Sequence, residues 1–491
     1  MKALLINTNR ERSPQPVIPL GLCLVASALK AHHFHPRLLD LAFSRHPARA
    51  IARAVRQWRP DVVCMSVRNL DNGEYLRPRG YIGEVAEVAL ASRQHFPPPL
   101  IIGGSAVSIA PAQMLARLGA DFAIVGDGEQ ALPELLTRIA DEEPVAGVSG
   151  VYCSNDALLP APARVEDLDS LPTAEAGRWL NLGRYFRCGS PMPLQSKRGC
   201  AFECIYCTYR LIEGAKYRLR SPDAVVAEVE EALVRWGARR FELVDATFNH
   251  PLDHALALCD AIARRGLRVD FHTMGLNPGA ASRELLMAMK AARFDSAVCA
   301  AESGSERMLE TLRKGFSVDD LAQTAAWAHE AGLPLLWSFM FGGPGETERT
   351  VRQTLSFIER ALGPQDRILC TIGLRVYPGT ELARVAREDD ALELQADLAD
   401  PVFYFSRGVA VERVLEVIER SPRRPQMIYL ETLQRPLIRW ALRVQAALRL
   451  RGPSWRGVPL YNRLTQWSHI RRPGLRTDAP NREQQSSRRS P

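Results

Sequence analysis

Two periodicities alternate along the first 140 residues of the chain. Short runs rich in Val, Ile and Leu are typical of buried strands, and the stretches between them repeat apolar residues every three or four positions, as one face of a helix does. Regular alternation of strand and helix predicts a doubly wound α/β domain with a parallel sheet, similar to a Rossmann fold. The expected strands are residues 2–7, 36–40, 61–67, 99–103 and 122–126, and the expected helices are residues 21–32, 48–57, 82–94 and 112–118.

A second α/β series runs from about residue 193 to residue 388. Six strands separated by amphipathic helices are fewer than the eight units of a closed barrel, so we expect an open, partial (β/α)6 barrel. The expected strands are residues 194–197, 240–244, 269–272, 296–300, 335–341 and 368–376.

The remaining segments differ in composition from the two α/β series. Residues 145–187 are rich in Pro, Ala and Asp and are expected to form a linker. Beyond residue 388 we expect a strand at 401–406, a helix at 411–418 and a cationic amphipathic helix at 436–450, and the polar end of the chain is typical of disorder. The predicted divisions are a Rossmann-like domain at 1–145, the linker at 146–186, the barrel at 187–395, a mostly helical region at 396–470 and a disordered basic tail at 471–491.

Charge is distributed unevenly along the 491 residues. The chain is 46% hydrophobic and 24% charged, which excludes a largely disordered protein, and its net charge is +8. Residues 401–491 hold 18 Arg, no Lys and 6 acidic residues, a net of +12, which leaves −4 for the rest. The basic region therefore says little about what the α/β domains bind. It predicts either a solvated helix packed on the barrel or a peripheral membrane contact, and it favours nucleic acid less.

Several features favour the cytoplasm. The N-terminal run turns polar at once, without the apolar core or cleavage site of a signal peptide, and no run of 18 apolar residues exists. Ten Cys are too few for a disulfide framework in a chain of this length, so a reducing compartment is expected.

Three thiols lie close together at Cys200, Cys204 and Cys207, between a short expected strand and a helix. A structural zinc site normally has four ligands, and this loop offers three with no His nearby. Three thiolates can instead hold a four-iron cluster and leave one iron open. The alternative is a loop with three free thiols.

This loop, with Tyr206 before the last Cys, resembles the radical S-adenosylmethionine (SAM) superfamily. The resemblance implies a [4Fe-4S] cluster on the three Cys, whose open iron binds SAM, and reductive cleavage of SAM to a 5′-deoxyadenosyl radical. It also implies that Asp245 binds the SAM amino group and that Glu302, with Ser303 and Gly304, binds the ribose. Later motifs resemble the adenine-binding strand end, at Gly342, Gly343 and Pro344, and the closing strand, at 375–380.

The residues of these motifs also have ordinary structural explanations. Glu302 can form an ion pair at the rim of a barrel, and residues 342–345 can form a plain turn from a strand to a helix, with Glu346 in the first helical turn.

A Rossmann-like domain ahead of such a barrel resembles the cobalamin-binding class of the superfamily. The resemblance implies cobalamin at the carboxyl ends of the strands, where parallel sheets bind ligands. The glycines there can bring backbone close to a ligand or simply form tight turns. The implied cofactor-binding residues are Pro19, Gly21, Arg68, Asn69, Gly103, Gly104, Ser105, Gly126, Gly128 and Glu129.

One departure concerns the cobalt ligand. The cobalamin signature Asp-x-His-x-x-Gly is absent from the first 190 residues. A literal match at residues 270–275, around His272, falls on an expected barrel strand, and we interpret it as a coincidence. Arg68 is therefore the candidate for the residue beneath the corrin, and it is grouped with the three Cys as catalytic. The alternative for Arg68 is a surface salt bridge with Asp71.

The preferred hypothesis is a cobalamin-dependent radical SAM methyltransferase that transfers a methyl group from methylcobalamin to an unactivated carbon of a small molecule. Its expected partners are that substrate and an external electron donor of the flavodoxin or ferredoxin type. The alternatives are a cyclase or rearrangement enzyme with the same cofactors and a non-catalytic cobalamin sensor or carrier. Methylthiotransferases are disfavoured because they carry three further N-terminal Cys, whereas this domain has only Cys23 and Cys64.

Overall fold

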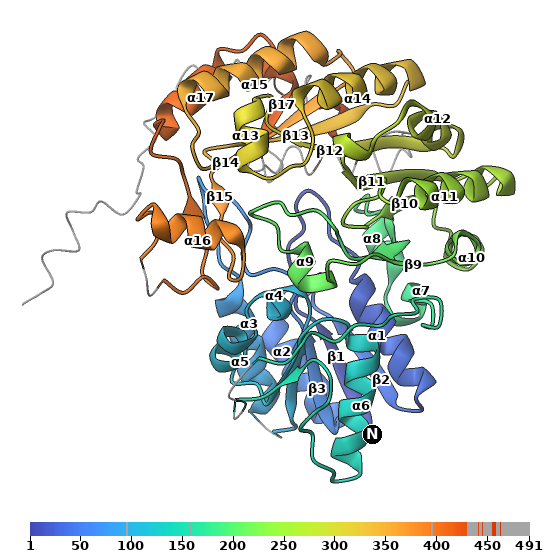
Figure 1. Ribbon diagram of the computed structural model, residues 1–491. Coiled ribbons are helices and arrows are strands. Elements are labelled where there is room, and N and C mark those ends of the chain that lie inside the picture. Colours follow the sequence, from blue (N-terminus) through green and yellow to red (C-terminus); the bar gives the residue numbers. More distant parts are fainter. Residues whose placement is uncertain are drawn as a thin grey trace, which may run out of the picture.

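The computed structural model describes residues 1–94, 97–154, 156, 159–393 and 396–429, together with 440, 444, 454–457 and 462. Two α/β domains lie one above the other in Figure 1, the N-terminal domain in blue and teal below and the barrel in green to orange above. The short helix α9 (Tyr209–Glu213) lies between them.

The N-terminal domain is built on a six-stranded sheet in the order β2-β1-β3-β4-β5-β6. Its first five strands are parallel, as predicted, and β6 pairs antiparallel with β5. The strands are β1 (Lys2–Asn7), β2 (His35–Asp40), β3 (Val62–Ser66), β4 (Leu100–Gly103), β5 (Phe122–Ile124) and β6 (Val151–Tyr152). The helices are α1 (Leu20–Ala31), α2 (Pro47–Trp58), α3 (Ile82–Arg93), α4 (Ser105–Ile109), α5 (Pro111–Leu118) and α6 (Gly128–Ala140).

Apolar side chains of the central strands point alternately to the two faces of the sheet, so the core of this domain lies on both faces. Leu4 and Ile6 of β1 pack in one apolar cluster with residues of α2, α3 and α5. Ala3 and Leu5 pack in a second cluster, with residues of α1 and α6. Because successive strand residues point to opposite faces, one apolar run buries both faces under helices.

The barrel is an open sheet of seven parallel strands in the order β17-β14-β13-β12-β11-β10-β7. All six expected strand regions contribute to it, and the seventh strand comes from the region predicted to be mostly helical. The strands are β7 (Met192–Leu194), β10 (Arg240–Leu243), β11 (Asp270–Leu276), β12 (Phe294–Glu302), β13 (Leu335–Phe341), β14 (Arg367–Ile372) and β17 (Met427–Tyr429).

Helices cover the outer face of this sheet, and the largest apolar cluster lies between the two layers (Figure 1). They are α10 (Pro222–Trp236), α11 (Leu252–Arg265), α12 (Arg283–Ala291), α14 (Val318–Ala331), α15 (Glu348–Ala361) and α17 (Val411–Glu419). Shorter helices are α7 (Ala176–Trp179), α8 (Leu182–Phe186), α13 (Glu306–Thr311) and α16 (Glu381–Glu388).

Two expected strands are divided in the structure. The strand expected at 194–197 is β7 followed by β8 (Lys197–Arg198), which pairs antiparallel with β9 (Arg218–Leu219). The strand expected at 368–376 breaks at Gly373, which has a φ of +70°, and continues as β15 (Leu374–Arg375) paired with β16 (Phe403–Tyr404). A side chain at Gly373 would meet the ring of Tyr75 from the N-terminal domain at 2.7 Å, so the break brings the two domains into contact.

The expected linker carries more structure than its composition predicts. It contributes β6 to the N-terminal sheet and buries Tyr185 of α8 in the barrel core. The predicted domain boundaries stay predictions. The amphipathic helix expected at 436–450 and the tail at 471–491 lie outside the described residues, apart from 440 and 444. Within the described part of the chain, no helix is long and apolar enough to cross a membrane.

Candidate functional site

The three predicted cluster ligands lie on one loop between β8 and β9. The loop is closed tightly at its start, because Gly199 has a φ of +98° and a Cβ there would lie 2.0 Å from the carbonyl oxygen of Lys216. Cys200 is buried, and Cys204 and Cys207 are partly exposed; none forms a disulfide. Burial raises the pKa of Cys207 to about 12, so a thiolate forms there readily only with a bound cation. The donor set fits a cluster with three protein ligands.

Glu302 lies beside this loop with one carboxylate oxygen unused. Its Oε1 accepts a hydrogen bond from the hydroxyl of Tyr206 (2.9 Å), whereas Oε2 is buried without a partner. Glu302 also adopts a φ of +62°, which an L residue rarely does and which is common at ligand sites. A buried, unpaired carboxylate oxygen fits a missing hydroxyl donor, as the ribose of SAM would supply.

Lys314 is a site residue that the sequence did not reveal. Its Nζ lies 3.0 Å from the hydroxyl of Tyr206 and 3.5 Å from Oε1 of Glu302. Burial lowers the pKa of Lys314, but the Glu302 carboxylate and the thiols of Cys204 and Cys207 together raise it by more, so the ammonium stays charged. Its local sequence does not distinguish it from a surface lysine.

The carboxylate of Asp245 is occupied by protein donors. Its Oδ1 accepts from the backbone N–H of Ser196 (2.7 Å) and of Lys197 (3.2 Å), and its Oδ2 accepts from the hydroxyl of Ser196 (2.5 Å). Burial raises the pKa of Asp245 in spite of the nearby Lys197. The bonds anchor the segment that leads to Cys200. These three bonds leave one acceptor position on Oδ2, and the predicted contact with the SAM amino group stays a prediction.

The predicted adenine and ribose glycines pack closely against other elements. A Cβ at Gly304 would meet the Cβ of Phe357 on α15 at 2.6 Å, and one at Gly342 would meet the ring of Phe405 at 2.5 Å. Next to Gly304, the hydroxyl of Ser303 hydrogen-bonds Thr354 at 2.9 Å. Close packing therefore explains these glycines without a ligand. The turn that contains Gly343 and Pro344 is held by Glu346, whose carboxylate accepts from the N–H of Gly342 at 2.5 Å.

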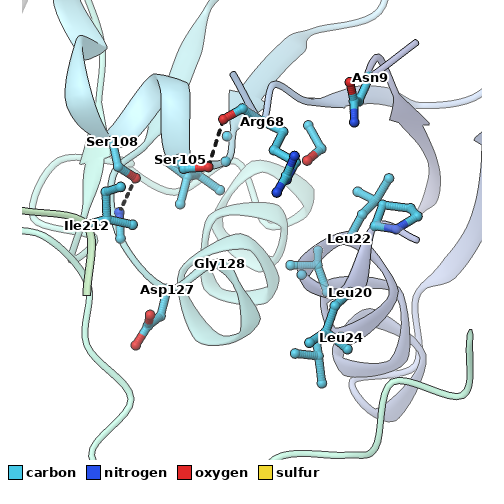
Figure 2. A pocket seen from close by; sticks show the side chains of 18 of the residues that line it. Asn9, Leu20, Leu22, Leu24, Arg68, Ser105, Ser108, Asp127, Gly128 and Ile212 are labelled. Atoms are coloured by element: carbon cyan, nitrogen blue, oxygen red, sulfur yellow. Dashed lines mark hydrogen bonds between the residues drawn. The ribbon is translucent and has the colours of Figure 1, made fainter. Parts of the chain in front are cut away.

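A cavity of about 500 Å³ opens at the carboxyl ends of the N-terminal strands. All ten residues predicted to bind cobalamin line it: Pro19, Gly21, Arg68, Asn69, Gly103, Gly104, Ser105, Gly126, Gly128 and Glu129. Figure 2 shows α1, with Leu20, Leu22 and Leu24, across the cavity from Arg68 and Ser105. The cavity lies where a doubly wound sheet binds its ligands, and its apolar and polar sides suit a large amphipathic cofactor.

Two glycines of this wall are required by the backbone. Gly104 has a φ of +101°, and a Cβ there would meet the carbonyl of Val67 at 2.6 Å; Gly126 has a φ of +93° and would meet that of Ala163 at 2.4 Å. Gly21, in contrast, has open space where a side chain would lie. The close approach of neighbouring backbone thus explains Gly104 and Gly126. Gly21 has no such neighbour and lines the cavity.

Arg68 points into the cavity (Figure 2). Its carbonyl accepts a hydrogen bond from Ser105 (2.9 Å), and its side chain is exposed. The alternative salt bridge with Asp71 is wrong, because Asp71 pairs with Arg375 of the barrel at 2.6 Å and both side chains are buried. Arg68 therefore lines the cavity, and its place beneath the corrin stays a prediction.

Part of the barrel side of the cavity is formed by the segment that follows the last cysteine. Thr208, Tyr209, Ile212 and Glu213 line it, and none of them was predicted. Glu213 accepts from the N–H of Gly199 at 3.0 Å, and burial raises the pKa of Glu213 to about 7. The only signal in the sequence is the position of these residues directly after the cluster motif.

His272 does not line this cavity. It lies on β11 of the barrel, with its Nε2 3.5 Å from Oε2 of Glu242. Its position agrees with the interpretation of the Asp-x-His-x-x-Gly match as a coincidence.

Two known families match the chain. The radical SAM superfamily matches residues 194–358, and the B12 binding domain matches residues 7–136. The chain therefore carries a B12-binding domain followed by a radical SAM domain. An uncharacterized methyltransferase of Pyrococcus horikoshii is 26% identical over 406 residues, which cover 80% of this chain and 84% of that protein. Tryptophan 2-C-methyltransferase of Streptomyces laurentii is 25% identical over 450 residues, which cover 78% of this chain and 74% of that protein.

A solved structure has the same two-domain fold. The radical S-adenosylmethionine methyltransferase TsrM from Kitasatospora setae, with cobalamin and a [4Fe-4S] cluster bound, matches with a TM-score of 0.82 and 22% sequence identity. The match covers 96% of this chain and 99% of that chain. The predicted fold class and the predicted pair of domains are confirmed.

Proposed function

We propose that this protein is a cobalamin-dependent methyltransferase of the radical SAM superfamily, acting at an unactivated carbon of a small molecule. One observation carries the proposal: a single short segment, Cys207 to Glu213, joins the cluster loop to the wall of the cobalamin cavity. When bound, the cluster supplies the electron that cleaves SAM, and cobalamin carries the methyl group. The protein would hold both reacting groups close to one another.

The SAM side of the site would be held by three side chains. Glu302 offers its free Oε2 to the ribose hydroxyls, and Tyr206 and Lys314 fix the other oxygen. Lys314 is also the nearby cation that can neutralise a carboxylate such as that of SAM. These residues bind and orient SAM, and Cys200, Cys204 and Cys207 hold the iron.

Arg68 would contact the cobalamin from the wall of the cavity. A guanidinium has no lone pair to offer a metal, so this side chain would not be a ligand and would exclude water from the part of the cofactor that it contacts.

The tryptophan-methylating relative supports a small-molecule substrate for this chain. We further propose that the electron comes from an external donor of the flavodoxin or ferredoxin type and that the protein acts in the cytoplasm. Ten free cysteines are consistent with that reducing compartment.

A test without the natural substrate uses anaerobically purified protein loaded with iron, sulfide and hydroxocobalamin. With SAM whose methyl group is deuterated and a strong reductant, we expect labelled methylcobalamin and 5′-deoxyadenosine. A protein that binds cobalamin but forms neither product would be the sensor or carrier. In mixtures of candidate substrates, a product without the label would identify the cyclase or rearrangement enzyme.

A further inference from the structure

The base of the cluster loop is held by the B12-binding domain. The loop leaves the barrel along β8 and returns along β9, and these two strands pair with Arg198 opposite Arg218. Both guanidinium groups are buried, and both contact carboxylates at the start of α6 in the other domain.

The contacts occupy all four oxygens of those carboxylates. Arg198 contacts Oε1 of Glu129 at 2.6 Å, its Oε2 at 3.3 Å and Oδ1 of Asp127 at 3.2 Å. Arg218 forms a hydrogen bond to Oδ2 of Asp127, and that oxygen also accepts from the N–H of Val165 at 2.9 Å. No described side chain of this network exposes more than 8% of its surface. Separating such a buried pair leaves each charge uncompensated, which is strongly destabilising. The ion pairs therefore hold β8, β9 and the start of α6 in a fixed arrangement.

The same side chains form part of the cobalamin cavity. Asp127, Glu129 and Arg198 line it, as does Glu213 at the end of α9. Glu213 also reaches the cluster loop through the N–H of Gly199, the residue before Cys200. The cavity wall and the two ends of the cluster loop are thus parts of one network.

We propose that Asp127 and Glu129 are positioning residues that couple occupation of the cobalamin cavity to the geometry of the cluster loop, through Arg198 and Arg218. The inference rests on the proposed function and goes beyond it, because it gives Glu129 a role in communication between two cofactor sites in place of direct contact with cobalamin. A bound cofactor that orders the start of α6 orders the base of the loop, and an assembled cluster that fixes the loop orders the cavity wall.

Coupling between two sites is reciprocal. If the cluster tightens cobalamin binding by some factor, cobalamin must tighten cluster binding by the same factor. Couplings of this kind are typically about 5- to 150-fold. The quantity to measure is therefore the ratio of two cobalamin dissociation constants, with and without the cluster, and not cobalamin affinity alone.

The experiment titrates hydroxocobalamin into the full chain under anaerobic conditions, with and without the reconstituted cluster, and follows the corrin absorbance. We expect at least about 5-fold tighter binding with the cluster. In Glu129→Gln we expect this ratio to fall to about 1, whatever the change in the cluster-free affinity. The matched control is Glu134→Gln on the same helix, where the ion pair with Arg138 is on the surface, and there the ratio should not change.

A second measurement and a second variant test the same coupling in a different way. Hydrogen exchange of residues 199–217 should slow when cobalamin binds to wild type, and less so in Glu129→Gln. Exchanging the charges, with Glu129→Arg and Arg198→Glu in one chain, should restore part of the ratio if the ion pair carries the coupling.

The outcomes separate this inference from the proposed function. A wild-type ratio of 1 with both cofactors bound, or an unchanged ratio in Glu129→Gln, overturns the coupling and leaves the proposed function intact. A cluster-free affinity that drops in Glu129→Gln as much as the cluster-bound affinity would make Glu129 a direct cobalamin ligand and would also overturn it. Failure of wild type to bind cobalamin or iron overturns both.

Discussion

The buried ion pair between Asp71 and Arg375 joins the two domains close to Arg68. Oδ2 of Asp71 lies 2.6 Å from Nε of Arg375, and the two side chains expose 0% and 5% of their surface. Arg375 also donates to the carbonyls of Leu398 and Val402. Asp71→Asn leaves these two carbonyl acceptors in place. It removes the only carboxylate that contacts the Arg375 guanidinium among the described residues. Leaving a buried charge without its partner costs about 3–5 kcal/mol, so we expect that loss in the free energy of unfolding.

The loss should reach the cofactor site, because Asp71 lies on the wall of the same cavity as Arg68. We expect weaker cobalamin binding in Asp71→Asn, measured by corrin absorbance beside urea unfolding. Arg375→Met should be at least as damaging, because it leaves the carboxylate alone. The double variant should recover much of the loss, because two neutral groups need no compensation. A loss below about 1 kcal/mol in Asp71→Asn, with cobalamin affinity unchanged, would refute the reasoning.

Four further predictions concern the residues of the predicted cofactor sites. Cys204→Ala removes one of three thiolate ligands, so the iron–sulfur absorbance and SAM cleavage should be lost. The control Cys259→Ala should change neither. An iron–sulfur absorbance and SAM cleavage that persisted in Cys204→Ala would contradict the cluster assignment. Arg68→Ala should let water bind the lower face of cobalt and slow methyl transfer. Electron paramagnetic resonance of cob(II)alamin should show no nitrogen splitting in wild type, and a splitting that disappeared in His272→Ala would make that residue the ligand. Burial raises the pKa of Glu346 from the ordinary 4.5 to about 7. Between these two pH values the folded state holds a proton that the unfolded state has released. The free energy of unfolding should therefore fall by about 3 kcal/mol as pH rises from about 4.5 to about 7. Glu346→Gln should lack that fall, and equal pH profiles for the two proteins would show that the carboxyl ionises normally.

The positions of most strands and the location of the cavity could be predicted from the sequence. Strand periodicity depends on neighbouring residues, so the β/α alternation is visible in one chain. The carboxyl ends of parallel strands meet at one edge, so the predicted strand-end residues had to gather there, and all ten line the cavity. The spacing of Cys200, Cys204 and Cys207 is likewise local and indicates its chemistry directly.

The partners of the charged residues were decided only by the tertiary structure. Arg198 and Glu129 lie 69 positions apart, and Asp71 and Arg375 lie 304 apart. Nothing in a single sequence says which of many arginines a given carboxylate will contact. The same holds for Lys314, which the fold buries beside Glu302 and the thiols of Cys204 and Cys207.

The seventh barrel strand shows the same division between local pattern and distant contact. Met427–Tyr429 is too short to show a strand period, and it becomes a strand because β14 offers it a parallel edge. Local pattern thus determined the two α/β domains and the cluster loop of this protein. Contacts between distant segments decided how the cavity wall and the cluster loop are joined, because the energy of those contacts exists only when the fold brings the segments together.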